Sequence, residues 1–168
     1  MTGADRPSSA PRASARHAWL AILLIAASTL APPVANAEPA VPQGVWLIDK
    51  KAAVQIFDCA GLMCGRILWL NVPRNALGQL DRDYHNPDQA LRTRELCGLT
   101  IFWDLHPDGE NRWKDGWFYN PDDGETYRVS AQLKSDDVIL ARIYLGIPLF
   151  GKTKTLERVP HGVTDGWC

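Results

Sequence analysis

Hydrophobic and polar residues alternate along much of the chain with a period of two, which is the spacing of a half-buried β-strand. The clearest case is residues 126–133, where Tyr127, Val129 and Ala131 fall on one face. Segments of this kind are rich in β-branched and aromatic residues and are separated by turn formers such as Pro-Asp-Gly at residues 107–109. The pattern predicts eight strands, over residues 44–48, 54–59, 65–70, 96–103, 111–120, 126–133, 138–145 and 152–158.

Eight evenly spaced strands with scarcely any helical periodicity predict an all-β domain. An antiparallel meander of this kind closes into an eight-stranded up-and-down barrel, whose interior is filled by side chains or holds one small ligand. A long polar segment at residues 71–95 interrupts the meander, and a turn at residues 86–88 predicts one short helix after it. Loops of this length are often functional, but a solvated strand connection is an equal alternative.

The N-terminus carries a different pattern. Arginines precede a largely apolar run at residues 18–30, and an Ala-Asn-Ala motif follows at residues 35–37. This three-part arrangement is typical of a secretory signal peptide, and the apolar run is shorter than a bilayer-spanning helix requires. We therefore predict a cleaved signal peptide over residues 1–37, a single β-barrel domain over residues 38–168, and a periplasmic or secreted location.

The charge of the chain is close to balanced, with a formal net charge of −1 over 168 residues. A balance of this kind offers no electrostatic reason to bind nucleic acid or an anionic membrane surface. No segment after the leader is long and apolar enough to predict a membrane-spanning helix. The predicted product is a soluble exported domain.

Four cysteines follow the predicted cleavage site: Cys59, Cys64, Cys97 and Cys168. An even number in an exported chain predicts disulfides, for which three pairings are possible. Cys59–Cys64 with Cys97–Cys168 is favoured because the first pair is local. Zinc is disfavoured because there is no C-x2-C pair and no suitably spaced histidine. A C-x4-C pair before a strand also differs from the C-x-x-C of thioredoxin-type redox sites.

Two short features recur in a known barrel class. Gly44-Val45-Trp46 opens the first predicted strand, and Arg158 ends the last one. In this respect the chain resembles the lipocalin-like (calycin) barrels, in which a late arginine packs on the tryptophan of a G-x-W motif. The resemblance implies structural roles for Gly44, Trp46 and Arg158 at the closed end of the barrel, through a cation–π contact.

A second resemblance covers nearly the whole of residues 38–168. The matching motifs are Gly44-x-Trp46, Cys59-x4-Cys64-Gly65-Arg66-Ile67, Asp83-x-x-Asn86-Pro87-Asp88, Leu96-Cys97-Gly98-Leu99, Gly116-Trp117-Phe118-Tyr119-Asn120-Pro121, Gly124-x-x-Tyr127 and Gly151-x-Thr153-x4-Arg158. With these motifs the chain resembles DUF2147, a family of exported bacterial proteins with a domain of unknown function. The resemblance implies export and a β-rich domain, and it implies no activity. Leu156 stands where many members have tryptophan.

Aromatic residues are the candidate ligand contacts. The chain has seven tryptophans, and aromatic side chains on strands either fill the core or line a pocket. Ile67 and Trp69 are expected on one side of their strand.

The function best supported is non-enzymatic binding of a small apolar or amphipathic ligand in the barrel, and the alternative is a cell-envelope interaction module that uses the 71–95 loop. The candidate ligand contacts are Trp69, Trp103, Trp117, Tyr119 and Tyr127.

Polar groups of the 71–95 loop offer the remaining chemistry. Asp81, Asp83 and Asp88 lack the spacing of a calcium loop, and self-capping turns explain them more simply. His85 is the one histidine in a polar cluster, next to Asp83 in sequence, so a hydrolase or isomerase at the barrel mouth is the third hypothesis. The sequence predicts no metal site, no cofactor and no catalytic residue of a recognised motif.

Overall fold

The structure is a computed structural model, and it describes residues 40–160. The predicted signal peptide at residues 1–37 and the predicted cysteine partner Cys168 lie outside the described residues. Both therefore stay predictions. Within residues 40–160, no helix is long and apolar enough to cross a membrane.

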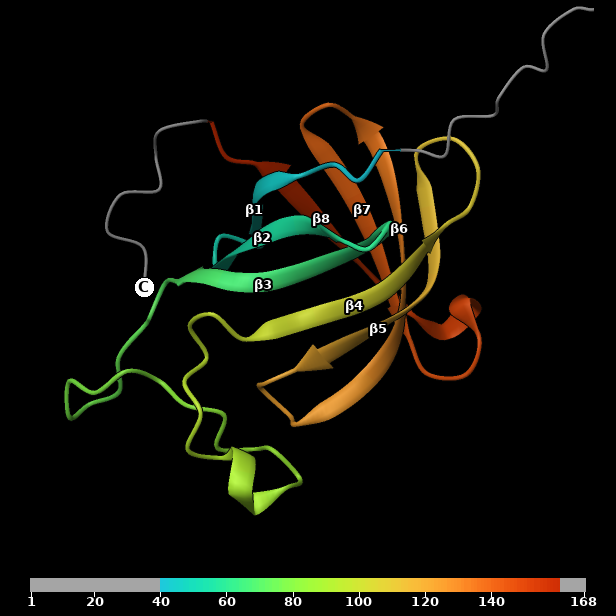
Figure 1. Cartoon of the computed structure of the whole chain (residues 1–168). Coiled ribbons are helices and arrows are strands. Elements are labelled where there is room, and N and C mark those ends of the chain that lie inside the picture. The colour runs from blue at the N-terminus through green and yellow to red at the C-terminus, as the bar shows by residue number, and fades with distance from the viewer. Residues whose placement is uncertain (1–39, 161–168) are drawn as a thin grey trace, which may run out of the picture. The chain divides into compact units, whose positions relative to one another are not determined.

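The described residues form a closed antiparallel barrel in which each strand pairs with the next in sequence and the last pairs with the first (Figure 1). This confirms the all-β, eight-stranded up-and-down barrel predicted from the sequence. The elements are β1 (Gly44–Ile48), β2 (Ala52–Cys59), β3 (Leu62–Leu70), η1 (Gln89–Leu91), β4 (Thr100–Pro107), β5 (Arg112–Asn120), β6 (Glu125–Ser135), β7 (Val138–Tyr144), η2 (Pro148–Phe150) and β8 (Lys152–Arg158), where η denotes a 3₁₀ helix.

The fourth strand begins later than the sequence predicts. Residues 96–99 form a turn, in which the Leu99 N–H donates to the Leu96 carbonyl and Gly98 has a φ of 83°. At its other end β4 continues to Pro107, four residues beyond the predicted end of the strand, although Asp104 has a φ of 58°. The strand then buries Leu105 in the core.

The interior of the barrel is packed with apolar side chains. Trp46 and Trp113 are at most 1% exposed, and they belong to one cluster of apolar side chains to which all eight strands contribute. The Phe102 ring packs so closely on the Gly65 backbone that a Cβ on Gly65 would lie 2.1 Å from the ring. The glycine therefore makes room for a neighbouring ring. Protein interiors at this density leave few voids larger than a water molecule.

One end of the barrel is closed by a cation–π contact and by hydrogen bonds. The guanidinium of Arg158 lies 4.1 Å from the Trp46 ring and donates to the carbonyls of Gln43 at 2.9 Å and Asp136 at 2.7 Å. Trp46 is fully buried, and its indole N–H donates to the Pro42 carbonyl. Gly44 has a φ of 131°, which side chains rarely adopt, and a Cβ there would lie 2.8 Å from Arg158 Nη1. We call this the closed end.

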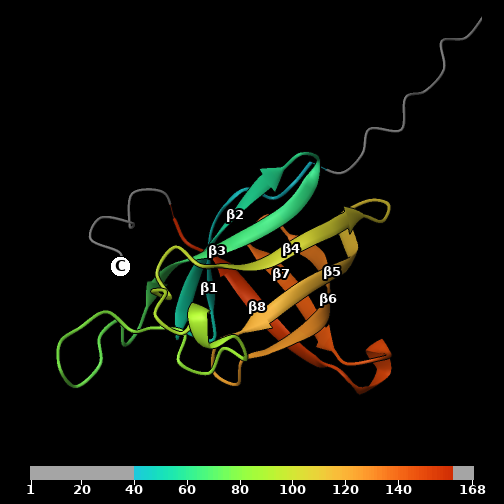
Figure 2. The ribbon, with the colours of Figure 1, turned by 60° about the horizontal axis from the view of Figure 1, so that its bottom comes forward.

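The opposite end carries the odd-to-even strand connections, and we call it the mouth end. Its rim consists of residues 49–51, 71–99, 121–124 and 145–151. The long β3–β4 connection and η2 of the β7–β8 connection lie on opposite sides of this end in both views (Figures 1 and 2). The mouth end therefore presents two large loops to different sides.

The cysteines form the local staple that the sequence predicts. Cys59 and Cys64 are joined by a disulfide across the β2–β3 turn, with their Cα atoms 6.0 Å apart. Among the described residues no cysteine is free. Because Cys168 lies outside residues 40–160, the Cys97–Cys168 pairing stays a prediction.

Candidate functional site

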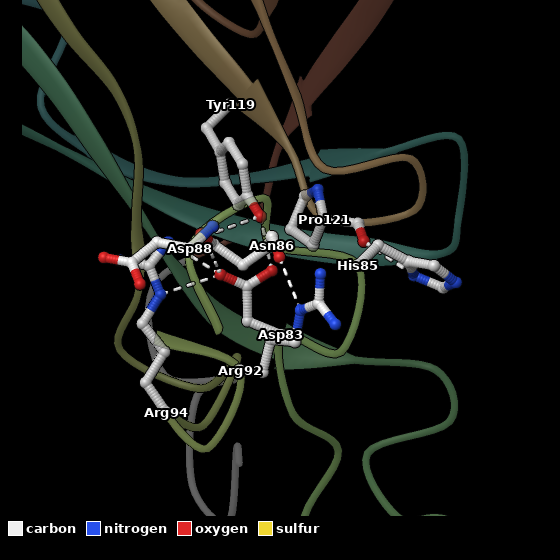
Figure 3. Close-up of polar contacts among 8 residues, drawn as sticks. All are labelled: Asp83, His85, Asn86, Asp88, Arg92, Arg94, Tyr119 and Pro121. Carbon is white, nitrogen blue, oxygen red and sulfur yellow. Dashed lines mark hydrogen bonds and ion pairs between the residues drawn. The ribbon is translucent and has the colours of Figure 1, made fainter. Parts of the chain in front are cut away.

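The 71–99 connection is held against the barrel by one buried carboxylate (Figure 3). Asp83 is completely buried. It accepts hydrogen bonds from the Tyr119 hydroxyl at 2.5 Å and the Asn86 side-chain amide at 2.8 Å. Arg94 donates to it from Nε at 2.8 Å and lies in an ion pair at 2.7 Å through Nη2. A buried carboxylate needs this degree of compensation to remain charged.

Local sequence explains how the loop brings these groups together. The Asn86 side chain accepts a hydrogen bond from the Asp88 N–H, and Asp88 caps η1 by accepting from the Ala90 N–H. These are the self-capping turns typical of Asn and Asp. Arg92 Nε then donates to the Asn86 carbonyl at 2.6 Å. The loop fixes its own shape, so that Asn86 meets the barrel in a defined orientation.

Tyr119 is the contribution of the barrel to this network. It lies on β5 and is 6% exposed, and the Arg94 guanidinium lies 5.4 Å from its ring. Burial, with the hydrogen bond to Asp83, raises the pKa of the Tyr119 hydroxyl above its usual value of 10.0. The hydroxyl therefore stays protonated at neutral pH and acts as the donor to the carboxylate.

The loop also rests on the β5–β6 turn. The His85 imidazole Nδ1 lies 3.3 Å from the Pro121 carbonyl oxygen. Gly124 of the same turn has a φ of 75°, and a Cβ there would lie 2.0 Å from the His85 carbonyl oxygen. Only a glycine permits this approach of two backbones. The loop thus contacts the barrel at two places, the side chain of Tyr119 and the β5–β6 turn.

Between the loop and the barrel wall lies a half-open hollow of about 270 Å³. Trp103 and Tyr119 provide its aromatic surface, and Thr100 and Thr126 contribute hydroxyl groups. The full lining is Asn86, Pro87, Arg94, Thr100, Trp103, Tyr119, Gly124 and Thr126. The hollow lies on the outer side of the strands, since Trp103 pairs with Trp117 while the neighbouring Phe102–Phe118 pair packs into the core.

Two of the five predicted ligand contacts line this hollow, and three lie elsewhere. Trp117 is beside Trp103 on the outer face, is 37% exposed and has the Arg128 guanidinium 4.2 Å from its ring. Tyr127 lies opposite Phe118, with ring centroids 6.4 Å apart, and its hydroxyl donates to Asp123. The aromatic residues therefore do not surround one space inside the barrel.

Trp69 is placed by an irregularity in β3. Val54 pairs with Ile67, but the adjacent Ala53 pairs with Trp69, so Leu68 is an extra residue. A bulge of this kind reverses the alternation of side chains. Leu70 then packs against the core in the place that Trp69 was expected to take. The expectation that Ile67 and Trp69 share a face is wrong for this reason.

The catalytic hypothesis finds no support in the placement of His85. Its side chain is exposed and contacts a backbone carbonyl, whereas Asp83 faces Tyr119, Asn86 and Arg94 (Figure 3). Among residues 40–160, no three His, Cys, Asp or Glu side chains gather as a metal site requires. The arrangement suits non-covalent binding by aromatic faces, hydroxyls and a guanidinium.

Sequence reasoning missed Arg94, Thr100 and Thr126. Arg94 lies eleven residues after the carboxylate it binds, and Thr126 stands opposite Tyr119 across β5 and β6. None of the three belongs to a motif that indicates binding. The position of Thr126 on the outer face could have been predicted, because the period of two places it on the face opposite to Tyr127, Val129 and Ala131.

Three comparisons relate the chain to known proteins. A family model described as an uncharacterized protein conserved in bacteria (DUF2147) matches residues 44–158. Among solved structures, the chain is similar to protein HP1028 from Helicobacter pylori, which is described as belonging to the lipocalin family, with 26% sequence identity and a TM-score of 0.64. That similarity covers 71% of this chain and 83% of the other. No curated protein matches the chain.

Proposed function

The chain belongs to the DUF2147 family of bacterial proteins, and from this premise we propose that it is a non-enzymatic binding protein for a small amphipathic molecule. The single observation that carries the proposal is the hollow between the 71–99 connection and β4–β6, with Trp103 and Tyr119 in its wall. The lipocalin-like fold supports a binding role by analogy only, because a fold hosts many functions.

The location that we propose for the binding site differs from the one expected from the sequence. A ligand inside the barrel needs space that the packed core does not offer, as the contact between Gly65 and Phe102 illustrates. The volume of the hollow is slightly below the usual range of small-molecule sites, which suits a small ligand. We therefore place the ligand on the outer wall, under the loop.

The chemistry of the lining defines the class of ligand. Trp103 offers a flat apolar surface, and aromatic groups gain binding energy beyond area burial when they stack on such a surface. Arg94 is 35% exposed at the edge of the hollow, and its guanidinium, which pairs with Asp83 through Nε and Nη2, offers Nη1 as a charged donor. Thr100 and Thr126 supply neutral donors and acceptors. A flat ring bearing a carboxylate or hydroxyl group fits this combination.

Export is part of the same proposal. The sequence pattern of residues 1–37 and the Cys59–Cys64 disulfide both favour an oxidising compartment outside the cytoplasm. Native mass spectrometry of the protein purified from its own cell envelope should give a chain beginning at Glu38. A chain that retains the leader would contradict cleavage, and a second, non-covalent mass would report the bound molecule.

The binding proposal is tested with naphthoate, a flat aromatic carboxylate, titrated into the protein and followed by isothermal calorimetry. Trp103→Leu is expected to weaken binding about tenfold, which corresponds to about 1.4 kcal/mol, because it removes the stacking surface. Trp117→Leu is the matched control, since it removes the neighbouring outer tryptophan that does not line the hollow.

The outcomes of this titration are distinct. Equal weakening by both variants would mean that naphthoate binds to the outer face in general and not to the hollow. Binding that neither variant weakens would exclude the hollow as the binding site. An absence of binding by naphthoate and by smaller aromatic acids, together with no co-purifying mass, would contradict the small-molecule function.

A second candidate function is a cell-envelope interaction module that uses the 71–95 loop. One observation favours it: Val72 and Leu77 are 68% and 82% exposed in this loop. Apolar side chains displayed in this way are typical of protein-binding loops. The two functions depend on different residues, because Trp103 belongs to the hollow and Leu77 does not.

A further inference from the structure

An apolar row of side chains crosses the outer wall of β1, β2 and β3, which lie side by side (Figure 1). Leu47 pairs with Ala53, and Ala53 pairs with Trp69. Opposed residues of antiparallel strands share a face, and this face is the outer one, because Trp46 and Val54 beside them in sequence belong to the core. Ala53 is completely buried, and its two large neighbours are half-buried. We call these three residues the apolar strip.

The turn at residues 96–99 is fixed beside this part of the wall. The Gly98 N–H donates to the Ile67 carbonyl at 2.9 Å, and the Ile67 N–H donates to the Leu99 carbonyl at 2.9 Å. Cys97 lies in this turn and is half-buried. Its backbone is therefore held at a defined place on β3.

The choice of partners for Cys97 is narrow. No cysteine among residues 40–160 is free, and Cys59 and Cys64 are bonded to each other. Of the four cysteines in the sequence, Cys168 is the one left. It stands eight positions after Pro160, the last described residue.

One row of the sheet joins the 96–99 turn to the end of β8. Ile67 pairs with Val54, Val54 with Trp46, and Trp46 with Arg158. Three strand spacings of about 4.8 Å make this path about 15 Å long. Eight extended residues reach roughly 26–29 Å. Residues 161–168 are thus long enough to cross β1, β2 and β3 and to reach the turn, with little slack once they pass over side chains.

The opposite way round the barrel is longer. A row that starts at Trp103 of β4 crosses β5 and β6 and ends at Tyr144 of β7. The residue before Tyr144 pairs with Lys152, the first residue of β8. A segment that follows β8 would have to return along the whole of this strand, about 20 Å, before it could take that row. The geometry therefore favours the path over β1, β2 and β3.

We propose that residues 161–168 form a strap that crosses the outer wall over β1, β2 and β3, covers the apolar strip and is tied to the 96–99 turn by a Cys97–Cys168 disulfide. Forming this bond removes two electrons and two protons from the two thiols, and a disulfide-bearing oxidant of the exporting compartment accepts them by thiol–disulfide exchange.

The composition of the strap suits this surface. Its sequence is His-Gly-Val-Thr-Asp-Gly-Trp-Cys. Val163 and Trp167 offer apolar groups to the strip, and the two glycines let the backbone follow a curved wall. Because the segment is attached to the barrel at Pro160 and at Cys97, its effective concentration at the strip exceeds that of any separate molecule.

The strap goes beyond the proposed ligand binding and does not depend on it. None of the three residues of the apolar strip lines the hollow. The two features meet at the 96–99 turn, which joins Arg94 to Thr100, and both of these residues line the hollow. The strap therefore also ties down the turn between them.

Photo-cross-linking of the full oxidised chain tests the path of the strap. Leu47→p-benzoylphenylalanine is expected to cross-link to residues 161–168, as mapped by mass spectrometry. Trp117→p-benzoylphenylalanine is the matched control and should give no such cross-link, because Trp117 lies on the outer wall but outside this path. Gln55, half-buried in the neighbouring outward row, is a second position for the probe if the Leu47 variant fails to fold.

The disulfide is tested by replacing both Cys97 and Cys168 with serine. The yield of the cross-link from position 47 is expected to fall several-fold, because the effective concentration of the segment at the strip falls when one attachment is lost. Cys59→Ser with Cys64→Ser is the matched control, since it removes the disulfide of the β2–β3 turn and should leave the yield unchanged.

Other outcomes would overturn the proposal. A cross-link to residues 161–168 from position 117, or from neither position 47 nor position 55, would exclude this path. An unchanged yield after loss of Cys97 and Cys168 would exclude the disulfide as the attachment. A covalent dimer on a non-reducing gel would assign Cys97 to a second copy of the chain. A concentration-dependent dimer in analytical ultracentrifugation, lost in Leu47→Ser, would make that copy the occupant of the strip.

Discussion

Replacing Asp83 with asparagine is expected to lower the free energy of unfolding by about 3 kcal/mol, because removing one partner of a buried ion pair leaves the other groups uncompensated. The amide keeps the shape of the carboxylate but loses its charge, and one oxygen becomes a donor that faces other donors. Arg94 and Asn86 both donate to the same carboxylate oxygen, Oδ2. If the amide oxygen takes the place of Oδ2, the amide NH2 faces the Tyr119 hydroxyl, which loses the acceptor it has in Oδ1. In the reverse orientation, Arg94 and Asn86 lose their acceptor.

Urea denaturation followed by tryptophan fluorescence measures this change. Asp122→Asn is the matched control, since it makes the same chemical change at an exposed position of the β5–β6 turn. The 71–99 connection should also become sensitive to proteolysis in Asp83→Asn, because the carboxylate joins it to Tyr119. A loss of stability no larger than that of the control would show that the network does not hold the loop.

The second large effect is expected from the addition of a single methyl group. Gly65→Ala should cost about 2–3 kcal/mol of stability, because overpacking a dense core forces side chains and backbone to shift. The new Cβ would lie 2.1 Å from Phe102 Cε2 and 2.3 Å from Cδ2. At these distances the Phe102 ring or the backbone of β3 must move to admit the methyl group.

A double-mutant cycle with Phe102→Leu separates crowding from other causes. The smaller side chain should make room for the methyl group, so the double variant is expected to be more stable than the sum of the two single changes implies. A neutral Gly65→Ala would mean that the interior has spare volume. In that case the original expectation of a ligand inside the barrel would regain its physical basis.

The barrel could be predicted because the pattern that defines each strand lies within a short stretch of sequence. The alternation in residues 126–133 survives intact in β6, where Val129 and Ala131 are buried. The fourth strand was misplaced by four residues at its start, since residues 96–99 have the apolar composition of a strand but turn at Gly98. Composition alone does not distinguish an apolar turn from an apolar strand.

The candidate site was much less predictable. Asp83 and Tyr119 are 36 positions apart, and nothing in either neighbourhood indicates the other. Bulges add a second difficulty, because Leu68 in β3 reverses which residues face the core. Aromatic residues could be identified as candidates, but their division between the interior and the outer wall depends on register. Register is a property of paired strands, which a single segment does not reveal.

The pairing of β8 with β1 has a consequence for how other proteins can bind. The Trp46–Arg158, Leu47–Glu157 and Ile48–Leu156 pairs close the last gap between strands, so the described sheet has no free edge. Recognition by strand addition, in which an extended peptide extends an open sheet, needs such an edge. A protein partner of residues 40–160 must therefore be recognised in a way other than strand addition, through the loops and turns at either end or through the outer wall.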